Sequence, residues 1–344
     1  MNATFLLWVG IAFFETALSG GVVLLNKHLL TCLDPVITNM MVRAVSFGTI
    51  LVVTAPLTLL DVWSLTYDMT WEAAGYITIL AVVGWLIAQN LYYFALRSGR
   101  VSVVVPIVST DLLFTALFAT LFIGGVLGNL TVAGLFIAVA GVVAITRAER
   151  RDRIDLIEPT DVVVADGLSQ EPIPPPSPPP PETGLVEEPR GLARSAPVAI
   201  VLALASAAGW GLAPVLIQLA QQSVGGTSVT MILQAQGLGL LMIIGVALIR
   251  RKPFTTRRLT PTERRRARRL VAITGAIEGS CAILFYLIVE NLGSVQSAII
   301  VATKPIFAIL WGALFLHERV SRRLAIGIAI TLLGVFMATA DRLH

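Results

Sequence analysis

The sequence predicts an all-α membrane protein of ten transmembrane helices, arranged as two inverted five-helix repeats. Three observations support this fold class. Hydrophobic residues make up 56% of the 344 positions, charged residues 13%, and the mean hydropathy is +0.83, which is too apolar for a chain folded in water. The apolar residues gather in stretches of membrane-spanning length. The two halves of the chain also match each other in sequence without a gap.

Each apolar stretch holds about 20 residues, enough to cross the hydrocarbon core as a helix. The predicted spans are 4–25, 36–58, 72–96, 101–123, 129–146, 196–219, 227–249, 270–290, 296–316 and 324–340. Short alternating strands typical of a barrel are missing from the sequence, so helices must satisfy the backbone in lipid. The chain has no Lys or Arg before Lys27, unlike a cleaved signal, so the first span is expected to be retained.

The internal match defines the predicted domains. Sliding one half along the other places Asp111 on Lys304 and Tyr93 on Tyr286. The expected units are a first repeat at 1–148, a Pro-rich disordered linker at 149–193 and a second repeat at 194–344. Because each repeat has an odd number of spans, the second enters the membrane in the opposite orientation. The proline run of the linker favours an extended tether, with docking to an aromatic-lined partner as the alternative.

Loop charges predict the orientation. Of the 25 Lys and Arg residues, all except Arg43, Lys304 and Arg342 lie in loops after odd-numbered spans. The positive-inside rule puts these loops and the linker in the cytoplasm of a cell inner membrane, and both termini outside. The basic run Arg250–Arg269 is either a topology anchor or a binding site for anionic lipid. Basic residues confined to loops between spans give no reason to expect nucleic acid.

Redox, metal and enzymatic chemistry are not expected. Cys32 and Cys281 lack redox or metal spacing, and His28, His317 and His344 lie at span ends or the terminus. No cofactor is predicted, and no His, Cys and carboxylate set has catalytic spacing. The sequence leaves the oligomeric state open.

Five ionisable residues fall inside the predicted spans. They are Glu15, Arg43, Asp111, Glu278 and Lys304. Each costs about 2.5–3.5 kcal/mol to insert on translocon scales for the costly types, so each should face a partner or a wet cavity. Asp111 and Lys304 lie near the middle of matching spans, where they form either a structural salt bridge or part of a site. Arg43 lies near a span end and is expected to snorkel or to pair with a carboxylate.

Glu15 and Glu278 are candidates for proton coupling, because a carboxyl without a nearby cation can be neutral at working pH. The repeat places Glu278 opposite Trp85. Helical spacing predicts that one face of each of two helices lines the same candidate pocket. The faces are Trp85, Gln89 and Tyr92 on the third span, and Glu278, Ala282 and Phe285 on the eighth. Ordinary helix packing is the alternative for the aromatic residues.

Helix interruptions also point to a site. Gly20-Gly21 in the first span matches Ala213-Pro214 in the sixth, a pattern typical of discontinuous helices at binding sites, with ordinary kinking as the alternative. Gln218 follows Pro214 at helical spacing and adds hydrogen-bonding capacity. Pro305, next to Lys304, should loosen the ninth span. Tyr286, the repeat partner of Tyr93, completes the candidate set from the second half.

Several motifs resemble the drug/metabolite transporter superfamily, in particular proteins with two EamA-type repeats. Trp210-Gly211 is similar to the aromatic-Gly signature of a repeat's first span, and Phe315–Ser321 with Gly327 and Leu333-Gly334-Val335 resembles a repeat ending. The resemblance covers both halves but not the linker. It implies a central substrate cavity, secondary transport and often export. It also implies cytoplasmic termini, whereas the loop charges predict external ones. Glu15 is similar in placement to the mid-helix glutamate of small multidrug-resistance subunits.

Three functions remain from the sequence. The first is a secondary transporter, expected to be an exporter, that moves a small metabolite or drug-like solute by alternating access with possible proton coupling. The second is a lipid-linked carrier or flippase. The third is a non-transporting scaffold that uses the Pro-rich linker. The expected partners are a small-molecule substrate and membrane lipid.

Overall fold

The computed structural model describes residues 3–60, 70–99, 101–124, 128–157, 196–224, 228–250, 260–316 and 322–340. All regular elements in these ranges are helices. The first half contains α1 (Ala3–Cys32), α2 (Pro35–Leu59), α3 (Trp71–Leu80), the π-helix η1 (Ala81–Ala88), α4 (Gln89–Ser98), α5 (Val101–Val108), α6 (Asp111–Ile123) and α7 (Asn129–Ile157). The second half contains α8 (Ala196–Val224), α9 (Ser228–Arg250), α10 (Pro261–Leu292), α11 (Ser294–Val301), α12 (Lys304–Leu316) and α13 (Arg322–Ala340).

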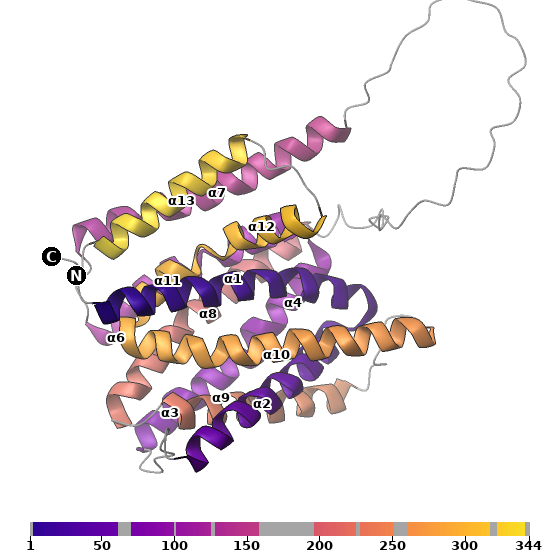
Figure 1. Ribbon diagram of the computed structural model, residues 1–344, viewed down its shortest axis with the longest axis vertical. Helices are drawn as coiled ribbons and strands as arrows, with labels where there is room; N and C mark the ends of the chain where they lie inside the picture. The colour runs from indigo at the N-terminus through magenta and orange to yellow at the C-terminus, as the bar shows by residue number, and fades with distance from the viewer. Residues whose placement is uncertain are drawn as a thin grey trace, which may run out of the picture.

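The two halves have corresponding helices and pack through one another. Helix α2 packs on its counterpart α9, and α7 on its counterpart α13. Helix α1 crosses to α12 of the other half, just as α8 crosses to α6. These reciprocal contacts are those of a pseudo-two-fold relation. In Figure 1, α1 begins and α13 ends at one end of the bundle, and α7 ends and α10 begins at the opposite end.

Six helical segments in the described ranges are long and apolar enough to cross a membrane. They are Thr4–Cys32, Pro35–Leu59, Trp71–Ser98, Val198–Ser223, Thr230–Arg250 and Pro261–Leu292. Shorter apolar helices accompany them at Asp111–Ile123, Asn129–Gly141, Ser294–Ala308 and Ala325–Gly334. A helix rises about 1.5 Å per residue, so each of the six covers the hydrocarbon thickness alone. The composition and the helix lengths therefore identify the molecule as an integral, multi-pass membrane protein.

The predicted fourth and ninth spans are each broken in the middle. Helix α5 ends at Val108 and α6 begins at Asp111, while α11 ends at Val301 and α12 begins at Lys304. At both breaks the backbone makes tighter three-residue bonds, Thr110 N to Ile107 O at 3.1 Å and Thr303 N to Ile300 O at 3.0 Å. The hydroxyls of the same two threonines bond the same carbonyls, each at 2.7 Å. Side-chain bonds of this kind compete with helical bonds and favour an interruption.

Glycines let two straight helices approach these breaks. A Cβ added to Gly20 in α1 would lie 2.9 Å from the Phe307 Cβ and 3.2 Å from the Lys304 carbonyl oxygen. A Cβ on Gly211 in α8 would lie 2.6 Å from the Asp111 carbonyl oxygen. The prediction that α1 and α8 are themselves discontinuous is wrong, because both run unbroken through Gly20-Gly21 and Pro214. The glycines serve close packing instead.

The structure also changes two predicted boundaries. Helix α10 begins at Pro261, behind a capping box in which the Thr260 side chain and Glu263 bond each other's backbone, so the second half of the basic run is helical. The remainder of that run, 251–259, lies outside the described residues. Helix α7 continues to Ile157, into the segment expected to be linker. The rest of that segment, with its proline run, is also outside the described residues, as are His317, His344 and Arg342.

Candidate functional site

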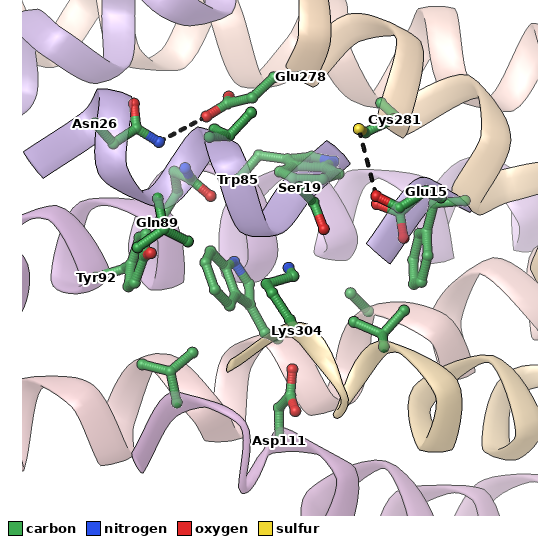
Figure 2. A pocket seen from close by; sticks show the side chains of 18 of the residues that line it. Glu15, Ser19, Asn26, Trp85, Gln89, Tyr92, Asp111, Glu278, Cys281 and Lys304 are labelled. Atoms are coloured by element: carbon green, nitrogen blue, oxygen red, sulfur yellow. Dashed lines mark hydrogen bonds between the residues drawn. The ribbon is translucent and has the colours of Figure 1, made fainter. Parts of the chain in front are cut away.

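A cavity of about 190 Å³ lies between the two halves, and both halves contribute side chains to it. Helix α1 supplies one polar face at regular helical spacing, formed by Glu15, Ser19 and Asn26. Helix α10 supplies Glu278 and Cys281 opposite this face (Figure 2). Phe285 of α10 also lines the cavity, and the rest of the chain contributes Arg43, Ser46, Trp85, Gln89, Tyr92, Ser109, Asp111, Trp210, Gln236 and Lys304. The cavity is therefore polar, charged and aromatic within an otherwise apolar bundle.

Glu278 is held by hydrogen bonds from the first half. Asn26 Nδ2 donates to its Oε1 at 2.9 Å (Figure 2), and the Tyr93 hydroxyl donates to the same oxygen at 3.3 Å. Tyr93 is itself completely buried. Since Asn26 and Tyr93 come from α1 and α4, this carboxylate joins three helices and both halves. A change in its charge or bonding would be felt by all of them.

Arg43 is buried at the centre of the bundle, with 4% of its surface exposed. Its Nη1 donates to Gln236 Oε1 at 2.5 Å, its Nε to Asn39 Oδ1 at 3.4 Å, and its guanidinium lies 4.8 Å from the centre of the Trp85 ring. Arg43 and Gln236 are 193 positions apart, so they are repeat equivalents in direct contact and lie near the pseudo-two-fold axis. Of the two roles expected for Arg43, snorkelling is wrong because the side chain is buried, and its direct hydrogen-bond partners are amides rather than a carboxylate. Its repeat partner is polar, which was the sequence signal for a central position.

Glu15 lies at the other end of the same chamber, with 5% of its surface exposed. The Thr16 hydroxyl is 3.5 Å from its Oε2, and Ser19 is a second nearby hydroxyl. Lys304 is the cation whose charge acts on Glu15. Cys281 Sγ lies 3.9 Å from the Glu15 backbone oxygen (Figure 2), which packs α10 tightly against α1. Glu15 therefore has weaker direct contacts than Glu278.

Asp111 and Lys304 line the same cavity but form no direct ion pair. Within the described residues, the one ion pair closer than 4.0 Å joins Arg97 to Asp34 at 3.6 Å. Asp111 instead accepts a bond from the Leu112 amide at 2.8 Å. Lys304 extends away from Asp111 toward the Ser19 side of the cavity (Figure 2), and its Nζ lies 5.9 Å from the Trp210 ring centre. The salt bridge considered from the sequence is thus replaced by two separate charges that interact across the chamber.

Aromatic side chains form the apolar walls. The rings of Tyr92 and Trp210 lie 4.8 Å apart at 49°, which is a close tilted contact. Trp85 stands in the π-helical segment η1, a geometry that often occurs at functional sites. The Trp210 indole Nε1 is buried and has no hydrogen-bond partner among the residues that the structure describes. A buried donor without a partner is costly, so a polar ligand atom would be a natural acceptor for it.

Two predicted site residues lie elsewhere. Gln218 accepts a bond from the Ser294 amide at 2.9 Å and so caps the start of α11. Tyr286 is 1% exposed and packs in an apolar cluster with Ile217 and Ile232. All the others border the cavity: Glu15, Trp85, Gln89, Tyr92, Asp111, Trp210, Glu278 and Lys304. Sequence reasoning passed over Asn26, Arg43 and Gln236 as members of this set, since amides and a basic residue near a span end also fit ordinary packing.

The chamber offers acid–base and ionic chemistry. Among the residues that the structure describes, no group of three His, Cys, Asp or Glu side chains is placed to hold a metal ion. The charged groups are three carboxylates and two cations facing one small space. Such a set can bind a polar solute by charge and hydrogen bonds while the aromatic rings contact its apolar part.

The fold and this chamber define a helical membrane protein with a polar compartment between two repeated halves. The family model of the EamA-like transporter family matches residues 6–147 and 197–340, and the chain belongs to that family. This confirms the resemblance seen in the motifs. The family consists of membrane transporters of small solutes. A comparison with curated proteins gives no match. One solved crystal structure of a protein aligns over 98% of this chain and 98% of its own, with 16% identity and a TM-score of 0.61, and so shares the fold.

Proposed function

We propose that the protein is a secondary transporter that exports a small metabolite or drug-like solute by alternating access. The observation that carries this proposal is a charged cavity that both halves form beside the two broken helices. Broken helices at a repeat interface are where secondary transporters bind their substrates. Rocking of one half against the other would open this chamber to each side in turn. Export is favoured by the resemblance to metabolite and drug exporters.

The proposed arrangement in the membrane has ten spans. In it, α3, η1 and α4 form one span, as do α5 with α6 and α11 with α12. The repeats are 1–148 and 194–344, joined by a cytoplasmic linker at 149–193, with both termini outside the inner membrane. Support comes from the loop charges, because the basic loop residues follow odd-numbered predicted spans in the sequence. Arg264, Arg265 and Arg268 are exposed in the first turns of α10, where anionic lipid headgroups would be their natural partners.

Proton coupling is assigned to Glu15 or Glu278. Both carboxyls face the cavity, and both lie where a proton taken up on one side could be released on the other. Glu15 is the stronger candidate, because its direct side-chain contacts are weaker than the two bonds that hold Glu278. Lys304 would respond to the charge of Glu15 and so transmit the protonation state to α12.

The test is solute transport in proteoliposomes across a range of pH values, with and without an imposed pH gradient. Replacing the coupling glutamate by glutamine mimics its protonated form. Glu15→Gln or Glu278→Gln should therefore abolish gradient-driven transport and leave downhill exchange largely intact. Glu72→Gln is the matched control, since Glu72 lies outside the cavity at the start of α3. A full gradient response in both cavity variants would exclude the two glutamates as coupling groups.

A further inference from the structure

Arg43 carries a full positive charge at the centre of the bundle, but its direct partners are neutral. Its hydrogen bonds go to the amide oxygens of Gln236 and Asn39, and its flat face covers Trp85. Guanidinium groups stay protonated in proteins. A buried charge is costly unless it is paired. Arg43 therefore lacks the partner that its position calls for.

The neighbouring carboxylate does not fill this role. Glu278 is the acid whose charge acts on Arg43, but its bonded oxygen is already held by Asn26 and Tyr93. Among the described residues, Arg43 forms no ion pair closer than 4.0 Å. The charge of Glu278 is thus the available internal compensation, and it leaves the guanidinium edge free to bind an anion.

The guanidinium also has donors to spare. It carries five N–H groups in a rigid fork, and its two bonds use one on Nε and one on Nη1, so three remain. Arg43 is one of the cavity-lining side chains. A planar fork of this kind matches a carboxylate through two parallel hydrogen bonds. Gln236 and Trp85 hold the fork in one orientation, so little side-chain freedom would be lost on binding.

The walls around the fork are aromatic. Trp85 lies against the guanidinium, and Tyr92 with Trp210 forms the wall from α4 and α8. These rings would contact a flat or apolar body whose charged end reaches Arg43. The second cation, Lys304, stands on the far side near Glu15 and Trp210, so the cavity is not a uniformly acidic site for cations.

We infer that Arg43 is the docking point for the carboxylate of the transported solute, and that the solute is a small organic carboxylate with a flat apolar body. This inference rests on the proposed transport function and names the substrate class of the same cavity. Gln236 and Trp85 act as positioning residues for the guanidinium. The bond between Arg43 and Gln236 also joins the two halves, so a solute that competes for Arg43 would loosen a contact between them.

The test compares two probes with one body. 3-Phenylpropanoate and 3-phenylpropanamide differ only at the group that would meet Arg43. Binding to the purified full chain in detergent is followed by quenching of tryptophan fluorescence, because Trp85 and Trp210 line the cavity, and by the shift in melting temperature. The carboxylate should bind about tenfold or more tightly than the amide, as expected for charge-assisted bonds. Equal affinity for the two probes, or binding of neither, would overturn the inference.

The decisive variant keeps Arg43 and supplies an internal competitor. Gln236→Glu is close to isosteric and puts a carboxylate on the guanidinium, so the chain should fold while carboxylate affinity falls about tenfold or more. Arg97→Gln, which removes an arginine outside the cavity, should bind like the unmodified chain. Unchanged affinity in Gln236→Glu would refute the docking role. Carboxylate binding that depends on Arg43 without any transport in proteoliposomes would instead refute the transport proposal alone.

Discussion

At the scale of single residues, Lys304 is a charged group of the cavity whose own helix disfavours its charge. It begins α12, where the helix dipole is positive and disfavours a cation. Asp111 occupies the equivalent place at the start of α6, where the same dipole favours its negative charge. Lys304 must therefore gain its stability from carboxylates across the chamber, namely Asp111 and Glu15. Asp111 and Lys304 occupy equivalent positions in the two repeats, but the helix dipole favours the charge of Asp111 and disfavours that of Lys304.

This asymmetry gives a residue-scale prediction. Lys304→Gln should lower the free energy of unfolding by about 1–3 kcal/mol, because Glu15 loses its compensating cation. The double variant with Glu15→Gln should recover part of that loss, with a coupling energy of about 0.5–3 kcal/mol in a double-mutant cycle. Denaturant unfolding in detergent measures all four proteins. Strictly additive losses would show that the two side chains do not interact.

A second test exchanges the two charged residues, as Asp111→Lys combined with Lys304→Asp, and measures the same free energy of unfolding. If the two formed a direct salt bridge, exchanging them would preserve it. In this structure the exchange places a carboxylate beside Glu15 and a cation beside the Leu112 amide, so stability should not recover. Recovery of stability in the exchanged protein would argue for a direct pair.

The sequence identified the charged residues of the site better than the neutral ones. Glu15, Asp111, Glu278 and Lys304 were predictable because charge inside a span is costly whatever the packing. Arg43 was expected to snorkel or to pair with a carboxylate, since distance from a span end does not reveal which way a side chain faces. Gln218 has the same limitation, because helical spacing gives a shared face but not the neighbour of that face.

At the scale of elements, the breaks before α6 and α12 place Asp111 and Lys304 in the cavity. Proline does not explain both. Pro305 follows the second break, but Leu112 occupies the equivalent position at the first, where the threonine bonding is the same. The sequence therefore predicted loosening of the ninth span for a reason that accounts for only one of the two breaks. The close approach of α1 and α8 to them depends on glycine.

The element-scale prediction concerns Gly211. A methyl group there would lie 2.5 Å from the Phe114 Cβ and 2.6 Å from the Asp111 carbonyl oxygen. Gly211→Ala should therefore push α8 away from α6 and destabilise the protein by about 1–3 kcal/mol. Gly10→Ala is the control, because nothing lies within 4 Å of its added Cβ, and it should be neutral or slightly stabilising. Melting temperatures of the two variants in detergent make the comparison. Equal behaviour would mean that the helices are not in close contact at Gly211.

At the scale of the whole molecule, the repeat was the most informative feature of the sequence. Matching helices begin at matching positions, as for Ala3 and Ala196 or Pro35 and Ser228, and the reciprocal packing follows from that equivalence. Six segments of the described residues are long and apolar enough to cross a membrane alone; the two broken stretches and the helices α7 and α13 hold the shorter apolar segments. The sequence does not predict which side chains of the two halves contact each other, because those contacts depend on how each helix is rotated about its axis.

Transport by alternating access requires that the cavity between the halves open in turn to the two sides of the membrane. Cys281 lines this cavity, and Cys32 lies at the end of α1, so the natural cysteines are suitable reporters. The most direct measurement is the rate at which a small, membrane-impermeant thiol reagent modifies each of them in vesicles of known orientation.

The prediction is that Cys281 reacts with reagent applied from either side, and that its modification blocks transport. In the matched Cys281→Ser variant, Cys32 should react only with reagent applied from the cytoplasmic side. Reaction of Cys281 from one side under every condition, or from neither side, would contradict alternating access through this cavity.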